Sequence, residues 1–193
     1  MTRLTRVCRA VGVGLATVTA TLAMTQAASA APAPPTAPAE LAPPPGNEAF
    51  LVAPAKGVQI YKCTKNTDSA TSATTPFKWV FDHPEATLTG DNGQIITHDA
   101  GPIWKAPDGS SVTGSAAIRF PAVFDPATAK DIQQLRLTGT PSGTGLLAAT
   151  TFIQRLNTQG GTQPPAAECK EQTLGKVKEV PYKADYVFFK KTA

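Results

Sequence analysis

Hydrophobic and polar residues alternate in several short segments of the chain, and a period of two is typical of half-buried β-strands. In residues 77–81, three aromatic side chains occupy every second position and therefore share one face. Similar patterns predict strands at residues 58–63, 112–120, 133–138, 146–158 and 182–188. The positions expected to face inward include Val112, Ala116, Ile118, Phe120, Leu135, Leu137, Tyr182, Ala184, Tyr186 and Phe188. Turn-forming triplets rich in Gly, Asp and Asn separate some of these segments.

One segment has the features of a helix start. Asp125 is a suitable N-cap, Pro126 fits the first helical position, and residues 127–134 are long enough for two turns. Many short strands at a spacing of roughly 8–12 residues are typical of antiparallel sandwiches and barrels. We therefore expect an all-β fold, a single antiparallel β-sandwich or flattened barrel with one short helix.

The first thirty residues have the three parts of a secretory signal peptide. Residues 1–9 contain three Arg and no acidic residue, residues 10–24 are small and apolar, and Ala28-Ser29-Ala30 supplies a cleavage site. A transmembrane anchor is the alternative, but an apolar run of about 15 residues is short of the roughly 20 that span a bilayer. We expect cleavage after Ala30, export, and no membrane span in the mature protein.

Residues 31–46 are rich in Pro and Ala, a composition that favours extended polyproline II and does not build a core. We expect a disordered linker here, although a ligand for proline-recognition modules or an envelope-spanning arm has the same composition. The folded domain then covers residues 47–191. A domain of that length is large enough to bury a proper core.

The charge balance argues against nucleic-acid binding. The chain has 18 basic and 14 acidic residues, but Arg3, Arg6 and Arg9 lie in the predicted signal peptide. The mature chain would keep 15 basic and 14 acidic residues, whereas proteins held by phosphate contacts carry a clear basic surplus.

The cysteines predict one disulfide. Cys8 would leave with the signal peptide, so that Cys63 and Cys169 remain in an exported chain. A reactive or metal-binding thiol pair is the alternative, but the two residues are far apart in sequence and no CxxC spacing is present. We therefore predict a Cys63–Cys169 bridge.

Motifs that bind common cofactors lack their structural context. Residues 143–148 match the pattern GxGxxA, but the Ala-Thr-Thr-Phe-Ile that follows favours a strand where a dinucleotide site needs a helix. A GxSxG nucleophile elbow and a Walker loop are absent from the sequence. We predict no cofactor.

The segment from His98 to Trp104 contains the residues best suited to catalysis or ligand binding. His98 ends a predicted strand beside Asp99, and a Gly-Pro pair makes the following loop rigid. A histidine there is suited to general base catalysis, to metal binding or to holding the loop through a hydrogen bond. The chain has only one other histidine, His83, and its cysteines are assigned to the disulfide, so we predict no metal site.

A second group of polar residues, Gln154, Arg155 and Asn157, interrupts an otherwise apolar strand pattern. One face of that strand must therefore bury a polar side chain, which requires a partner. Arg155 is suited to an anionic ligand or to tying loops together. We predict that His98 and Arg155 belong to one polar cluster beside Trp104.

Several landmarks occur together in a fixed order: Gly57–Cys63, His98, Gly101-Pro102-x-Trp104, Asp108-Gly109-Ser110, Ile153–Gly161, Cys169 and Pro181–Phe188. As a set they resemble the family catalogued as domain of unknown function 3455, exported proteins of bacteria and fungi. The resemblance covers about residues 46–190. It implies export and brings with it no agreed activity and no established catalytic residues.

Together these features predict an exported, disulfide-bridged all-β protein that binds a small polar or carbohydrate ligand outside the cell or at the envelope. Trp104 would stack on the ligand, and His98, Gln154, Arg155 and Asn157 would form hydrogen bonds with it. One alternative is a secreted hydrolase with His98 as general base and Asp99 or Asp108 as its support. Another is a purely structural envelope protein.

Overall fold

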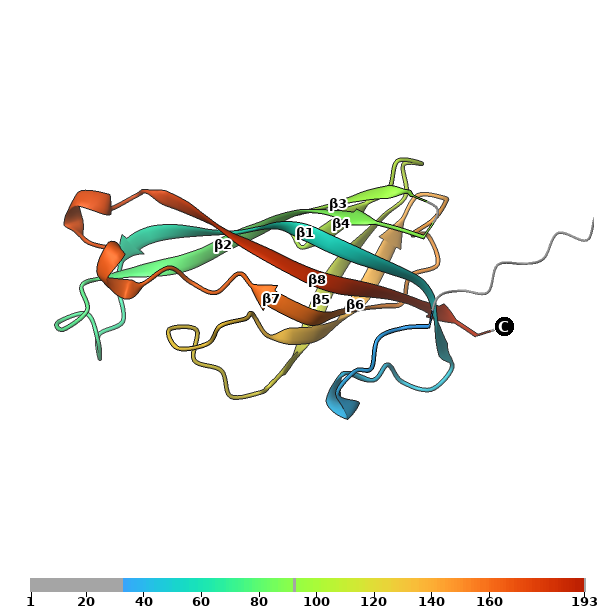
Figure 1. The fold of residues 1–193 in the computed structure, drawn as a ribbon, viewed down its shortest axis with the longest axis horizontal. Coiled ribbons are helices and arrows are strands. Elements are labelled where there is room, and N and C mark those ends of the chain that lie inside the picture. Colours follow the sequence, from blue (N-terminus) through green and yellow to red (C-terminus); the bar gives the residue numbers. More distant parts are fainter. Residues whose placement is uncertain (1–32, 92, 193) are drawn as a thin grey trace, which may run out of the picture. The chain divides into compact units, whose positions relative to one another are not determined.

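The structure is a computed structural model and describes residues 33–91 and 93–192. The predicted signal peptide and its cleavage site after Ala30 lie outside the described residues. The described part contains eight strands (Figure 1): β1 (Asn47–Lys65), β2 (Phe77–Thr89), β3 (Ile95–Asp99), β4 (Ile103–Lys105), β5 (Ser111–Phe120), β6 (Gln134–Ser142), β7 (Phe152–Gly160) and β8 (Val177–Lys191).

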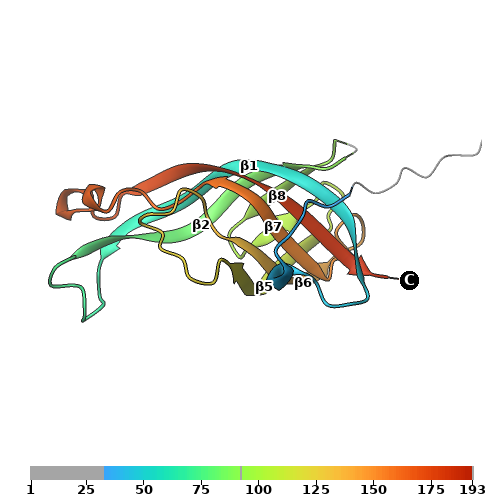
Figure 2. The same ribbon diagram turned by 60° about the horizontal axis from the view of Figure 1, so that its bottom comes forward.

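Each strand pairs antiparallel with the next along the chain, and the order closes because β1 pairs with both β2 and β8. Figure 1 and Figure 2 both show β1 and β8 side by side along their length. The predicted all-β antiparallel fold is thus confirmed in its class, and its hydrogen bonds form a closed barrel.

The barrel wall is incomplete over part of its height because β3 and β4 are only five and three residues long. Residues 77–85 of β2 pair with β1 alone, since β3 reaches only residues 86–89. On the other side, β4 pairs with residues 111–113 of β5, and residues 115–120 pair with β6 alone. No hydrogen bonds join these parts of β2 and β5, and we call the gap between them the slot.

The barrel interior holds the main hydrophobic cluster. It contains the predicted inward residues Leu135 and Leu137 and all four from β8, Tyr182, Ala184, Tyr186 and Phe188. Alternation was reliable here because β6 and β8 contain no extra residue in these stretches: β6 keeps one register with β7, and residues 182–188 of β8 keep one register with β1.

The alternation in β5 fails at a bulge. Ala116 has a φ of 48°, and the register with β6 shifts between Ser115 and Ile118. An extra residue reverses the faces of the positions after it, so Ile118 is 41% exposed where the pattern predicted burial. The predicted strand from residue 146 is also too long, because turns occupy residues 146–149 and β7 begins at Phe152.

The helix predicted at residues 127–134 is wrong. Asp125 does cap a turn, since its Oδ1 accepts from the Ala127 N–H at 2.9 Å. The chain then joins the sheet: the Ile132 N–H donates to the Gly160 carbonyl at 3.0 Å and Asp131 forms a bridge with Gly161. The helical turns of the described residues are three short 3-10 segments, η1 (Ala39–Leu41), η2 (Ala166–Glu168) and η3 (Glu171–Thr173).

No helix in the described ranges is long and apolar enough to cross a membrane.

The predicted disulfide is present. Cys63 in β1 is bonded to Cys169 after η2, with Cα atoms 5.4 Å apart. Both cysteines are buried in a small cluster with Tyr61 and Trp79. The Trp79 indole N–H donates to the Pro165 carbonyl at 3.2 Å, so the same loop is tied to the sheet twice.

The segment around Leu41, within the expected linker, packs on the outer face of the barrel. Leu41 is fully buried against Leu156, Val187 and Phe189. Its carbonyl accepts a hydrogen bond from Nε2 of Gln154 at 2.7 Å. A Pro-rich composition therefore did not prevent packing, because one leucine had an apolar patch of β7 and β8 to cover.

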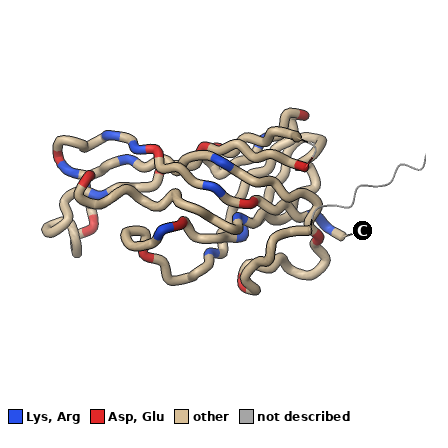
Figure 3. The backbone as a smooth tube through the Cα atoms, viewed as in Figure 1, with Lys and Arg blue, Asp and Glu red and all other residues tan. Residues whose placement is uncertain are grey.

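Charged residues of both signs are spread over strands and loops (Figure 3). Several form ion pairs on the surface, for example Lys190 with Glu48 at 3.3 Å and Lys105 with Asp99 at 3.7 Å. Exposed pairs of this kind contribute little to stability. Arg155 is not part of this charged surface, because it lines a cavity inside the barrel.

Candidate functional site

A cavity of about 760 Å³ lies inside the barrel and reaches the slot between β2 and β5. Residues at the slot include Phe81, Asp82, His83, Pro84, Ser115, Ala116, Ala117 and Arg119. Deeper lining residues include Gln59, Tyr61, His98, Trp104, Arg155 and Tyr186. The missing ladder between β2 and β5 thus coincides with the opening of the cavity.

His98 and Trp104 form one wall of this cavity. They are register partners on β3 and β4, and their rings are stacked with centroids 4.2 Å apart. His98 Nδ1 lies 3.0 Å from the Ile103 carbonyl oxygen. A carbonyl only accepts, so Nδ1 carries the proton and Nε2 keeps its lone pair.

The ring of His98 is neutral around pH 7. Its side chain is almost completely buried, and this desolvation lowers the pKa of His98 to about 4. In the residues that the structure describes, no hydrogen-bond partner meets Nε2. The neutral imidazole therefore offers one free acceptor.

Neither carboxylate considered as a support for His98 hydrogen-bonds to it. Asp99 lies 3.7 Å from the Lys105 ammonium group. Asp108 holds a turn, since its Oδ1 accepts from the Ser110 hydroxyl at 2.6 Å and its Oδ2 from the Leu146 N–H at 2.6 Å. The acid–base arrangement considered from the sequence is therefore not formed, and the backbone of Ile103 orients the imidazole in its place.

Arg155 projects from β7 beside Tyr186 of β8, its register partner. Its Nε and Nη2 donate to the Gln133 carbonyl at 3.3 and 2.8 Å. These contacts use two of the five N–H groups of a guanidinium and hold its plane. Within residues 33–91 and 93–192, no carboxylate lies within ion-pair distance of Arg155.

Tyrosine side chains surround Arg155. Tyr186 packs edge-on against both His98 and Trp104, at 5.3 and 5.5 Å between centroids, and its hydroxyl lies 3.2 Å from that of Tyr182. Burial raises the pKa of both tyrosines, and the charge of Arg155 opposes that shift. The phenols therefore stay protonated beside the guanidinium of Arg155.

Two buried donors near the cavity lack partners. Gln59 Nε2 and Trp104 Nε1 make no hydrogen bond within the described ranges, although both side chains are almost inaccessible. An unsatisfied buried polar group costs about 1–3 kcal/mol. Both residues line the cavity, so both unpaired donors lie at this site.

Three of the five predicted ligand-binding residues, His98, Trp104 and Arg155, line one cavity. Gln154 does not, because neighbouring residues of a strand point to opposite faces; it lies on the outer face and binds the Leu41 carbonyl. Sequence reasoning missed Gln59 and Tyr61. For Tyr186, its place on the predicted inward face of β8 was an available signal.

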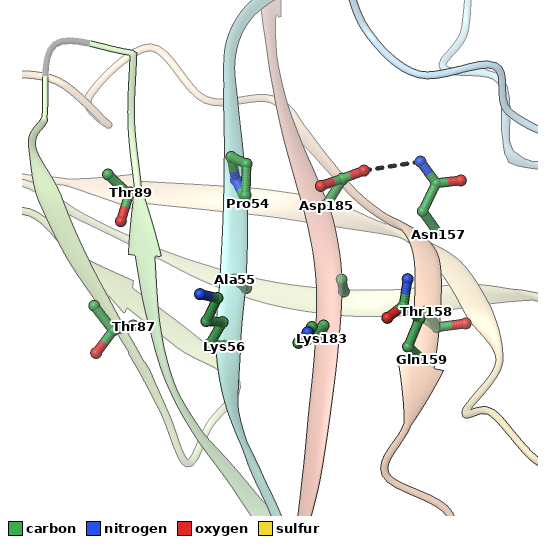
Figure 4. Close-up of a pocket in the computed structure, with 11 residues that line it drawn as sticks. Pro54, Ala55, Lys56, Thr87, Thr89, Asn157, Thr158, Gln159, Lys183 and Asp185 are labelled. Atoms are coloured by element: carbon green, nitrogen blue, oxygen red, sulfur yellow. Dashed lines mark hydrogen bonds between the residues drawn. The ribbon is translucent and has the colours of Figure 1, made fainter.

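Asn157 also lies outside the cavity. It sits at a bulge in β7 with a φ of 49°, a conformation that Asn tolerates, and its Nδ2 donates to Asp185 Oδ2 at 2.8 Å. Figure 4 shows this bond at the side of a separate outer groove over β1, β2, β7 and β8. The bulge, which no pattern in the sequence announced, moves Asn157 away from Arg155.

Metal-ligand residues do not cluster in the described part of the chain: it holds no group of three His, Cys, Asp or Glu side chains arranged for an ion. His83, at the slot, instead bonds Asp82 at 3.1 Å and Glu85 at 3.3 Å.

A family model described as "Protein of unknown function (DUF3455)" matches residues 44–190. The chain belongs to this family. No curated protein and no solved structure was found to match it. The DUF3455 match begins just before β1 and ends in β8, so it covers the whole barrel, the cavity and the disulfide.

Proposed function

We propose that this DUF3455 protein is exported and binds a small polar ligand in the barrel cavity. The observation that carries the proposal is the cavity beside the β2–β5 slot. It combines the guanidinium of Arg155 with two buried donors, on Gln59 and Trp104, that have no partner among the described residues.

The size and lining of the cavity support this proposal. Small-molecule sites commonly measure about 300–1,000 Å³ and combine apolar walls with a few polar groups. This cavity is about 760 Å³, with Trp104, Tyr61 and Tyr186 among its aromatic lining residues. Aromatic faces beside hydrogen-bonding groups suit a sugar or another compact ring.

Binding is better supported than hydrolysis. A general base works best when its pKa is near the operating pH, and burial holds the pKa of His98 at about 4. The imidazole of His98 hydrogen-bonds to the backbone carbonyl of Ile103, which orients the ring but adds no negative charge. A purely structural role gives no reason to keep buried donors unpaired next to a cavity.

Tryptophan fluorescence tests the proposal directly, because the chain has only two Trp, Trp79 and Trp104. In the Trp79→Phe variant the emission reports on Trp104 alone. We expect sugars or small organic acids to change that emission, and Trp104→Phe to leave a signal that does not respond.

A variant at the slot tests whether the ligand binds in the cavity. Ala117 is exposed and lines the opening, so Ala117→Phe in the Trp79→Phe background should narrow entry without altering the core. Binding that weakens in this variant locates the ligand in the cavity. A Trp104 signal that no compound changes would overturn the proposed function.

Export is a separate part of the proposal and rests on the order of charged, apolar and small residues before Ala30. N-terminal sequencing of protein from culture medium should give a chain that starts at Ala31. A chain that starts at Met1 and is found only in the cytosol would contradict it.

A further inference from the structure

We infer that the ligand is a hydroxy acid, a small organic anion whose carboxylate pairs with Arg155 and whose hydroxyl group donates to Nε2 of His98. The inference rests on the proposed function, because it assigns a chemical class to the occupant of the same cavity. Its support is the charge and the hydrogen-bonding inventory of the cavity wall.

The charge of Arg155 calls for an anion. The guanidinium is partly buried, and the ion pairs of the described residues do not include it. Asp82 and Arg119 also line the cavity, but both are exposed at the slot, where water screens them. A cation that is partly withdrawn from water and has no counter-charge is unfavourable, and a ligand carboxylate supplies a negative charge.

The orientation of Arg155 favours a planar anion. Its Nε and Nη2 are held on the Gln133 carbonyl, so the guanidinium is positioned before a ligand arrives. Guanidinium groups recognise carboxylates through parallel N–H bonds, and a group already held loses less entropy on binding.

The remaining polar groups define the rest of the ligand. Gln59 Nε2 and Trp104 Nε1 are donors that need acceptors. Nε2 of His98 is an acceptor and needs a donor, because Nδ1 already donates to Ile103. A carboxylate alone gives no donor, and a neutral sugar leaves the charge of Arg155 unpaired. A hydroxy acid provides both the negative charge for Arg155 and a hydroxyl donor for His98.

Two kinds of compound share this chemistry, a sugar acid and a phenolic acid, and both fit the aromatic lining of the cavity. Calorimetric titration of the chain with its disulfide intact distinguishes them. Glucuronate and 4-hydroxybenzoate are the acidic probes, glucose and methyl 4-hydroxybenzoate are their neutral matches, and benzoate lacks the hydroxyl group.

We expect at least one acidic probe to bind at least tenfold more tightly than its neutral match. Arg155→Gln should remove that preference, since a charge-assisted contact contributes about 1.5–3 kcal/mol, or roughly 10–150-fold in affinity. Lys62→Gln removes an exposed cation that does not line the cavity and should leave binding within about twofold, as a matched control. Comparison of acid with neutral probe uses the unmodified protein, so it stands even if a variant fails to fold.

The outcomes separate the inference from the proposed function. If glucose and the methyl ester each bind as well as the matching acid, or if Arg155→Gln keeps the preference, the hydroxy-acid inference is wrong while the binding cavity stands. If the acids do not bind but other compounds change Trp104 emission, the inference is again wrong. If no compound changes that emission, both fail.

Discussion

His98 and Trp104 lie face to face inside the barrel, with ring centroids 4.2 Å apart and 4° between the ring planes. Because they are register partners at the β3–β4 hairpin, the backbone pairing itself produces the stack. Tyr186 packs edge-on against both rings. The imidazole is therefore fixed in orientation, shielded from water and kept neutral.

Stability should depend on pH through His98. Its pKa is about 4 in the folded protein, below the ordinary value of 6.5, so the unfolded chain binds a proton more readily. The stabilisation is complete above about pH 6.5 and is lost as the pH falls towards 4. Between pH 7 and pH 4, His98 should account for about 3 kcal/mol of lost unfolding free energy.

Urea unfolding of the wild type and of His98→Gln at both pH values isolates this contribution from that of the carboxylates. The loss between pH 7 and pH 4 should be smaller in the variant. Equal losses in the two proteins would show that His98 does not titrate as its burial implies.

The disulfide should contribute strongly to stability, because it closes a loop with a sequence separation of 106 residues. In the chain-entropy model, cross-linking a loop of that length stabilises a protein by roughly 4–5 kcal/mol, often less in practice. The double variant Cys63→Ala with Cys169→Ala should therefore unfold at a clearly lower urea concentration. Thiol titration of unfolded, unreduced wild type should find both residues blocked, and two free thiols would contradict the bridge.

Gly57 should not tolerate a side chain. A Cβ there would lie 2.1 Å from the carbonyl oxygen of Glu85 and 2.5 Å from Cα of Ala86, both in the backbone of β2. Gly57→Ala must push β1 and β2 apart, and we expect a cost of about 3 kcal/mol or more. Gly90→Ala is the control, because the Cβ would meet the flexible ends of Gln94 and Leu51. Equal thermal melting temperatures for the two variants would refute the close approach.

Leu41 should act as part of the core although it precedes the first strand. It is fully buried against β7 and β8, and removal of a buried leucine side chain costs about 2–5 kcal/mol. Leu41→Ala should lower the melting temperature, whereas Glu40→Ala, at the exposed neighbouring position, should change it little. A melting temperature unchanged by Leu41→Ala would mean that the segment does not pack in solution.

Local alternation was enough to predict the class of fold and much of its interior. Residues 182–188 alternate without interruption, and their inward set lies in the main hydrophobic cluster. The predicted mature chain keeps two cysteines, which allow only one internal pair, so their bonding followed from counting. His98, Trp104 and Arg155 line one cavity, but the partner that a polar residue within an apolar strand needs is, for Arg155, the Gln133 carbonyl and not His98.

Tertiary structure decided the parts that local pattern does not contain. Gln154 and Arg155 had to point to opposite faces, but only the closure of the barrel determined that Arg155 lies inside. At the bulges of Ala116 and Asn157, an extra residue in the pairing with the neighbouring strand turned the following side chains to the other face. Residues 127–134 do not form the predicted helix, because the Ile132 N–H donates to the Gly160 carbonyl and joins this segment to the sheet. The slot exists because β3 and β4 are too short to bridge β2 and β5, and a missing ladder depends on strands far apart in sequence.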